Sequence, residues 1–221
     1  MSMTSQMPEE LRNECGTWAT KLEGRLDERE CIAFVRRALP RLLEQRELFQ
    51  NVLQNIASAA PYPDTRRSTL FENELILYIH EQSLFSLRML MSRSGEHTPI
   101  HDHNAWGVIA PLTGILGVTT YERMDDGTRE GIADIRRKSH RVLHPGDTED
   151  VLPLNRGIHR TGNEGGDILV MVSVYGKPVR RPYVLEFNME EGRTVPIYTP
   201  RTRKRILARE VLDTWKGSYR T

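Results

Sequence analysis

The feature that most constrains the fold is a change in the spacing of apolar residues near residue 60. From about residue 8 to residue 60, apolar residues recur at intervals of three and four, which predicts a helical region, broken near Pro40. From Leu75 onward they form short runs bounded by Gly, Pro, Asp and Asn, which predicts strands and turns. The chain is therefore expected to be mainly β, with a helical N-terminal region.

The predicted strands follow one another at the short intervals typical of an antiparallel sandwich or barrel. They lie near residues 74–80, 84–92, 106–111, 115–122, 131–136, 140–144, 149–153, 158–162, 167–175 and 182–188. No linker or internal repeat divides the sequence, so residues 1–221 are expected to form one domain whose barrel spans about 70–190. The basic segment 200–221 is expected to be a solvated tail or a short amphipathic helix.

The composition narrows the class of partner. The 221 residues include 31 basic and 30 acidic side chains, so the chain as a whole presents no strong field to nucleic acid or to a membrane. It contains no apolar run long enough to span a bilayer, and its first residues are polar. Two cysteines, Cys15 and Cys31, are too few for a disulfide framework and fit a reducing compartment. We expect a cytoplasmic protein with a small-molecule partner; the oligomeric state stays open.

Three histidines form a candidate metal site. His101 and His103 are two residues apart, so on a strand or extended loop their side chains point the same way. A neighbouring strand can supply the third imidazole, from His159. Three neutral imidazoles suit a divalent first-row metal and leave coordination positions free for substrate and dioxygen. A bare H-x-H also occurs by chance, and the remaining histidines are expected to be ordinary surface or hydrogen-bonded residues: His80, His97, His140 and His144.

The surroundings of these histidines resemble the two motifs of the cupin family. The first motif, G-x5-H-x-H-x3,4-E-x6-G, is matched by Gly95, His101, His103 and Gly114, but Gly107 stands where the glutamate would be. The second is resembled by Gly146, Pro153, His159 and Asn163. The resemblance implies an antiparallel β-barrel of jelly-roll form. Because Gly107 cannot ligate, the site should be a neutral three-histidine face, which favours an anionic ligand such as a thiolate.

Within the cupins, the chain resembles the bacterial branch of the cysteine dioxygenase-type thiol dioxygenases, which includes 3-mercaptopropionate dioxygenases. The matching pieces are TPIHDHNAWGVIAPLTG at 98–114, GIHRTGN at 157–163, VSVYG at 172–176 and EFNMEEGRTVPIY at 186–198. The resemblance implies Fe(II) on His101, His103 and His159, and addition of both atoms of dioxygen to a substrate sulfur to give a sulfinic acid. It also implies that Tyr175 is the active-site tyrosine.

The sequence departs from those relatives around the expected substrate pocket. Met171 and Ser173 occupy the serine and histidine positions of the usual Ser-x-His-x-Tyr strand, which alters the hydrogen bonding of Tyr175 and enlarges the pocket. The segment 71–85 lacks the early-strand arginine that holds the carboxylate in cysteine-specific members, so a thiol or thione other than L-cysteine is expected.

Other residues are candidates for the pocket. A substrate carboxylate could meet Arg180 or Arg181, although adjacent loop arginines are usually solvated. Trp106 either walls the pocket or fills the core. No tyrosine–cysteine crosslink is expected, because both cysteines lie in the helical region. Two alternatives remain: a cupin dioxygenase that cleaves a carbon–carbon bond in a phenolic or enol substrate, and a non-catalytic cupin that binds a small molecule.

Overall fold

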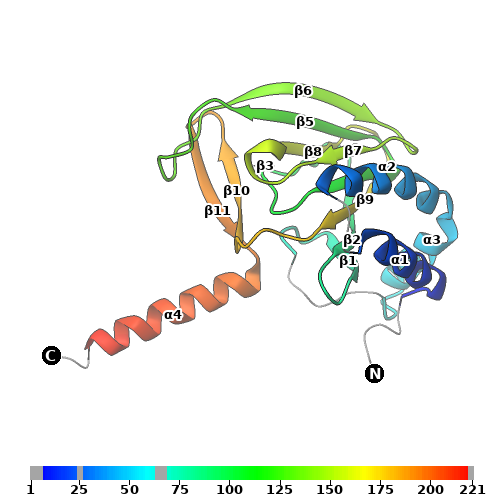
Figure 1. Cartoon of the computed structure of the whole chain (residues 1–221), viewed down its shortest axis with the longest axis horizontal. Coiled ribbons are helices and arrows are strands. Elements are labelled where there is room, and N and C mark those ends of the chain that lie inside the picture. The colour runs from blue at the N-terminus through cyan, green and yellow to red at the C-terminus, as the bar shows by residue number, and fades with distance from the viewer. Residues whose placement is uncertain (1–6, 24–26, 63–68, 219–221) are drawn as a thin grey trace.

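The computed structural model describes residues 7–23, 27–62 and 69–218 (Figure 1). Three helices come first, at α1 (Glu9–Leu22), α2 (Glu28–Glu44) and α3 (Arg46–Ala57). The strands are β1 (Glu74–Ile79), β2 (Phe85–Ser92), β3 (Ile100–His101), β4 (Gly107–Thr113), β5 (Leu116–Arg123), β6 (Ile135–Leu143), β7 (Glu149–Val151), β8 (His159–Asn163), β9 (Leu169–Gly176), β10 (Tyr183–Asn188) and β11 (Arg193–Tyr198). A last helix, α4, spans Pro200–Ser218.

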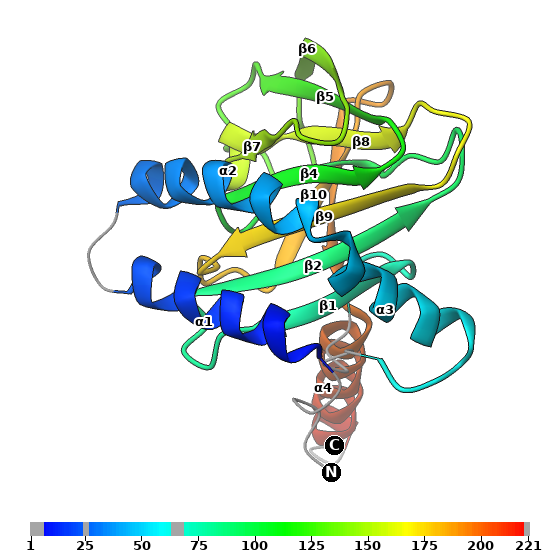
Figure 2. The same cartoon turned by 90° about the vertical axis from the view of Figure 1, so that its right-hand side faces the viewer.

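The strands form two antiparallel sheets that face each other. One has the order β1-β2-β9-β4-β7 and the other β11-β10-β3-β8-β5-β6. Helices α1, α2 and α3 lie over the outer face of the five-stranded sheet (Figure 2). The predicted fold class, a mainly β, cupin-type antiparallel barrel with an N-terminal helical region, is confirmed. That residues 1–221 form one domain stays a prediction.

The five-stranded sheet is buried on both faces, because successive side chains of a strand point to opposite sides. On β9, Val170, Val172 and Val174 belong to the cluster packed against the helices. Leu169 and Met171 belong to the cluster between the two sheets. Both sets are apolar, which explains why β9 is almost continuously hydrophobic rather than alternating.

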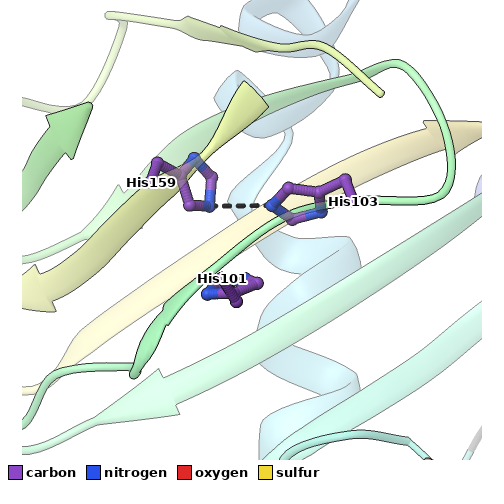
Figure 3. Close-up of side chains that lie close together, drawn as sticks. All are labelled: His101, His103 and His159. Carbon is purple, nitrogen blue, oxygen red and sulfur yellow. Dashed lines mark hydrogen bonds between the residues drawn. The ribbon is translucent and has the colours of Figure 1, made fainter. Parts of the chain in front are cut away.

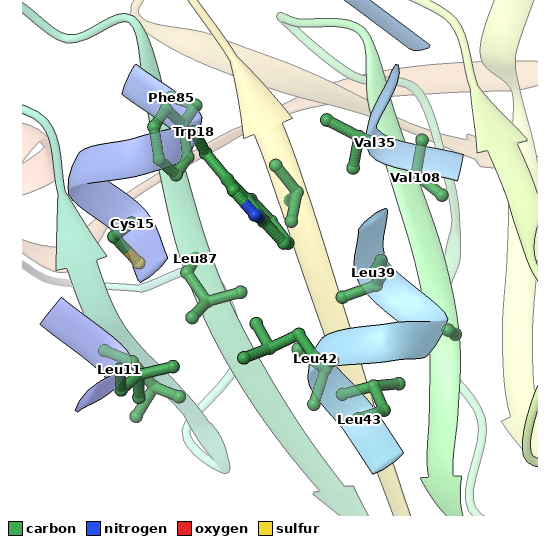
Figure 4. Close-up of a cluster of buried hydrophobic side chains, with 14 of the residues drawn as sticks. Leu11, Cys15, Trp18, Val35, Leu39, Leu42, Leu43, Phe85, Leu87 and Val108 are labelled. Carbon is green, nitrogen blue, oxygen red and sulfur yellow. The ribbon is translucent and has the colours of Figure 1, made fainter. Parts of the chain in front are cut away.

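The helix-covered cluster is anchored by large side chains that water does not reach. It includes Leu11, Trp18, Leu39, Phe85 and Leu87, each at most 1% exposed (Figure 4). Both cysteines are buried within it, and burial raises the pKa of Cys15 to about 12. The N-terminal helices are thus an integral cover of the barrel.

The predicted break near Pro40 was wrong, because Pro40 lies inside α2 and the helix continues to Glu44. A proline in a helix interior costs about 3 kcal/mol. Leu42 and Leu43, in the turn that follows, are buried against the sheet, and each contributes about 1.5–3 kcal/mol. Their burial is enough to offset the lost backbone hydrogen bond.

The predicted strands at 131–136 and 140–144 are corrected to one continuous strand, β6. Its central residues are polar, which suggested a turn, but β6 is an edge strand and only its two end residues are buried. The opposite edge strand, β11, was not predicted; it is largely exposed and contains Pro196, which edge positions tolerate. His140 therefore lies in the middle part of β6.

The basic C-terminal segment was expected to be either a solvated tail or a short amphipathic helix, and it forms a helix. Helix α4 extends away from the barrel (Figure 1), and residues 219–221 of the predicted segment lie outside the described residues. Within the described ranges, no helix is both long and apolar enough to cross a membrane.

A core substitution tests whether the helices and the sheet share one stabilising cluster. Leu87→Ala should lower the free energy of unfolding by about 2–5 kcal/mol, because it leaves a cavity at a fully buried position. Met124→Ala, at a residue 49% exposed, is the control and should change it by less than about 0.5 kcal/mol. Urea denaturation of both variants measures this, and equal losses would contradict the packing described.

Candidate metal centre and adjoining cavity

The three predicted histidines meet between the sheets. His101 ends β3 and is directly paired with His159 at the start of β8, so the ladder itself sets two imidazoles side by side. His103 follows two residues later, in the loop that leads into β4. All three side chains are buried, at 3%, 8% and 4% exposure for His101, His103 and His159. Figure 3 shows their rings turned toward one another.

The separations of the ring nitrogens fit a shared ion. One ring nitrogen from each histidine lies within 4.8 Å of the others. The Nε2 atoms of His103 and His159 are 3.0 Å apart, about the separation of two nitrogens bound to one ion at about 2.1 Å. Pro99 O is 2.9 Å from His101 Nδ1, so Nδ1–H can donate to it and leave Nε2 as the ligand atom. Across residues 7–23, 27–62 and 69–218, this is the one such group of histidine, cysteine and carboxylate side chains.

Burial keeps these imidazoles neutral. It lowers the pKa of His101, and it lowers the pKa of His103 and His159 well below the usual value. Neighbouring histidines lower the pKa of His103 and His159 further. Neutral imidazole is the form that binds a metal. The donor set therefore fits a divalent first-row metal ion, and the three protein ligands bring no charge to it.

The side chain of Asp102, between His101 and His103, points away from the imidazoles and holds the segment in place. Asp102 is fully buried and forms a bidentate ion pair with Arg181, with distances of 2.7 and 2.8 Å. It also accepts a 2.7 Å hydrogen bond from the Leu185 backbone N–H. Asn104 accepts a hydrogen bond from Arg181 Nε and donates to the backbone carbonyls of Arg181 and Tyr183, the second of which begins β10. These contacts fix the backbone that carries His101 and His103.

Tyr175 occupies the place that a side chain at position 107 would need. Gly107 is paired with Tyr175 across β4 and β9. A Cβ at Gly107 would lie 2.6 Å from Cδ1 of the Tyr175 ring and 2.9 Å from the Val174 carbonyl oxygen. The tyrosine ring stacks on His103, with centroids 5.3 Å apart and planes 18° apart. The missing cupin glutamate and the tyrosine are thus sterically linked.

The phenol of Tyr175 is a proton donor at neutral pH. Burial, with a smaller contribution from Glu74, raises the pKa of Tyr175. Ser173, two residues earlier on the same face of β9, forms a side-chain hydrogen bond with it. Ser173 itself is buried, so this contact is shielded from water.

A cavity of about 320 Å³ opens beside the histidines, and its wall includes His101, His103 and Tyr175. It also includes Arg88, on β2, an early-strand arginine that was not predicted and that lies just beyond the segment 71–85. The Cζ atom of Arg88 lies 5.2 Å from the centroid of the Tyr175 ring. The volume suits a small ligand.

Arg88 has one guanidinium nitrogen to spare. Its Nε donates to Ser86 Oγ at 3.1 Å, and its Nη1 donates to Glu74 Oε1 at 3.3 Å. Within the described residues, Nη2 makes no hydrogen bond. An anionic group in the cavity could therefore be met by a charge that is already oriented.

The other predicted pocket residues are distributed differently. Arg181 lines the cavity, but Nε, Nη1 and Nη2 already donate to Asn104 and Asp102. Arg180 is exposed and away from the cavity wall. Trp106 packs with the helix-covered cluster and over Gly176, while Met171 packs with the inner core. Direct contact of substrate with Arg180, Arg181, Met171, Ser173 or Trp106 stays a prediction.

The remaining histidines have structural surroundings. His97 is exposed and its ring covers Gly162, where a Cβ would lie 2.0 Å from it. His140 lies 3.2 Å from Glu164 and bonds with Thr119. His80 stacks on Phe85. None of the three belongs to the metal-ligand group.

Comparison with known proteins gives matches to cupin barrels. No family model matches the chain. A cupin 2 conserved barrel domain protein from Salinispora arenicola is 18% identical with a TM-score of 0.35, covering 51% of this chain and 83% of that chain. A cupin-like protein from Thermotoga maritima is 16% identical with a TM-score of 0.38, covering 54% and 82%. An oxalate oxidase in complex with glycolate is 18% identical with a TM-score of 0.37, covering 54% and 59%. None of these matches bears on the reaction.

Removal of single imidazoles tests the metal centre. His103→Ala and His159→Ala should each abolish stoichiometric binding of a divalent first-row metal, because two imidazoles remain and the vacated space is apolar and buried. His97→Ala and His140→Ala, outside the cluster, should bind as the parent does. Elemental analysis after anaerobic loading with ferrous iron and with cobalt, followed by dialysis, measures this. Full occupancy in the His159 variant would contradict the site.

The packing of Tyr175 against Gly107 is tested by adding one methyl group. Gly107→Ala should lower the free energy of unfolding by about 1–3 kcal/mol, because the Val174 carbonyl belongs to the sheet and cannot move aside. Gly16→Ala, in α1 with open space around it, should instead stabilise by about 0.5–1 kcal/mol. Thermal and urea unfolding compare the two. A neutral Gly107→Ala would mean that the tyrosine does not occupy this place.

Proposed function

We propose that this protein is a non-haem iron thiol dioxygenase, which adds both atoms of dioxygen to the sulfur of a small thiol or thione to give a sulfinic acid. The observation that carries the proposal is the buried set of three neutral imidazoles with a tyrosine ring in place of a carboxylate ligand. Such a face favours an anionic, soft ligand, and a thiolate is both.

The chemistry balances without a further reductant. A thiol and one dioxygen give one sulfinic acid, in which two new sulfur–oxygen bonds form and the sulfur supplies all four electrons. A ferrous ion on His101, His103 and His159 would supply dioxygen activation and a soft acceptor for the sulfur. The three ligand side chains are themselves buried, which strengthens the electrostatic contacts made among them.

The chain's own residues then have distinct parts. Tyr175 holds its proton and can donate a hydrogen bond to an oxygen on sulfur as negative charge develops there. Ser173 orients that phenol through their hydrogen bond. The Asp102–Arg181 pair holds the segment of the two first ligands in place and is a positioning element.

Arg88 supports a carboxylate-bearing thiol as the substrate. It stands on an early strand, beside Tyr175 and in the cavity wall, with Nη2 unused among the described residues. Its presence removes one ground for excluding L-cysteine, namely the lack of an arginine in 71–85. Met171 and Ser173 still differ from the residues of the cysteine-specific strand, so mercapto acids remain the preferred substrate candidates.

Anaerobic loading with ferrous iron, followed by dioxygen uptake and mass spectrometry, tests the proposal. The panel contains L-cysteine, 3-mercaptopropionate, mercaptosuccinate and an imidazole thione. We expect a product heavier by two oxygen atoms with at least one thiol, and its loss in His159→Ala. Background uptake with every thiol, despite one bound iron, would overturn the proposal and favour the phenolic or enol substrate.

Arg88→Gln tests the carboxylate contact. It should raise KM for the preferred mercapto acid roughly 10- to 100-fold, because a charge-assisted hydrogen bond contributes about 1.5–3 kcal/mol. Turnover of 2-aminoethanethiol, which lacks the carboxylate, should change far less. Arg180→Gln is the matched control and should leave both unchanged, since Arg180 is exposed and outside the cavity wall. An equal loss with both thiols would show that Arg88 acts on Tyr175 or the fold instead.

A further inference from the structure

Helix α4 is the one long element of the described residues that leaves the barrel without packing along it (Figures 1 and 2). Its large apolar side chains are exposed: Leu207 by 51%, Val211 by 47%, Leu212 by 51% and Trp215 by 59%. A helix of this length in water gains most of its stability from packing an apolar face. The face is therefore expected to meet a partner.

The exposed large apolar residues of α4 share one side. Leu207, Val211 and Trp215 follow one another at intervals of four, which places them on a single stripe, with Ala208 and Leu212 beside it. The stripe extends for roughly 12 Å at about 1.5 Å per residue. It ends in an exposed tryptophan, a residue favoured at the boundary between apolar and aqueous phases.

The charges of α4 are ordered about that stripe. Residues 201–215 hold five of the chain's basic residues and only two acidic ones. By helical spacing, Arg201 and Lys204 continue the apolar side toward the barrel and Arg205 borders it. Asp213 lies on the opposite side, and Glu210 lies at the flank away from these cations. The face that needs a partner is thus both apolar and cationic, and its acids point away.

This combination selects among partners. Pairing with a second copy of α4 would bring Arg201 and Lys204 of both copies into the seam, where apolar residues are required. Nucleic acid would meet the cations but would offer nothing to Leu207, Val211 and Trp215. An anionic bilayer surface satisfies both, because its headgroups attract Arg and Lys while the boundary of the acyl chains accepts Leu, Val and Trp.

We propose that α4 is a peripheral anchor that lies in the surface of an anionic phospholipid bilayer, with Leu207, Val211 and Trp215 inserted and Arg201, Lys204 and Arg205 against the headgroups. The near-neutral net charge of the whole chain predicted no membrane partner. The net charge does not reveal that cations are concentrated in α4, since they are balanced by acidic residues elsewhere in the chain. This role is independent of the chemistry of the histidine site.

Cosedimentation of the full chain with phosphatidylcholine vesicles, with and without phosphatidylserine, tests the proposal. We expect binding to the serine-containing vesicles only, weakened by salt. Trp215 should report insertion by a blue shift of its emission, absent in Trp215→Phe even though that variant still binds.

Three sets of variants separate the causes. Leu207→Ser with Val211→Ser and Trp215→Ser should lose binding, and Arg201→Gln with Lys204→Gln and Arg205→Gln should bind roughly a hundredfold more weakly. The matched control makes the same change of charge at exposed positions of α2, Arg29→Gln, Arg37→Gln and Arg41→Gln, and should bind as the parent does. Equal weakening by the control would overturn the proposal. So would failure to bind vesicles together with a dimer in analytical ultracentrifugation that the serine substitutions dissociate.

Discussion

The burial of one sheet on both of its faces is the constraint on which the rest of the structure depends. Side chains alternate along β9, so a single strand serves the helix-covered core with Val170, Val172 and Val174, and the barrel interior with the residues between them. The outer face would be exposed without α1, α2 and α3. The inner face can carry polar groups at its end, where Ser173 and Tyr175 lie, because the other residues of β9 already pack in apolar clusters.

The metal centre depends on the Asp102–Arg181 ion pair, although neither residue is one of the three candidate metal ligands. Asp102 lies between His101 and His103 and is fully buried, while its partner Arg181 is partly buried. Loss of one partner of such a pair leaves an uncompensated charge and costs about 3–5 kcal/mol. The same alternation that points the two imidazoles inward points Asp102 outward, toward the strand β10 that Arg181 precedes. The positions of His101 and His103 are thus fixed by contacts on the opposite side of their backbone segment.

The sequence was enough to predict what depends on local pattern. The period-two spacing of His101 and His103 and the strand around His159 predicted their convergence, and the apolar runs predicted most strands. Contacts between residues far apart in the sequence could not be predicted. No local pattern indicates that Arg181 is the counterion of Asp102, since a loop arginine is usually solvated. Arg88 lies within the strand predicted at 84–92, but which residue of a strand enters a cavity depends on a register that only the neighbouring strands fix. The edge strand β6 was predicted as two strands because its central residues are polar, and β11 was not predicted because Pro196 interrupts its pattern.

Tyr175 and Gly107 together decide the charge of the site. A carboxylate at position 107 would give the ion a fixed negative ligand, but its Cβ would collide with the Tyr175 ring and with the Val174 carbonyl. The phenol that takes the space keeps its proton, so it adds a hydrogen-bond donor and no charge. A divalent ion held there by three neutral imidazoles would remain doubly positive until a ligand arrives. The substrate must then bring the anion, and Arg88, beside the same tyrosine, offers a second cationic contact for one small molecule that carries two negative groups.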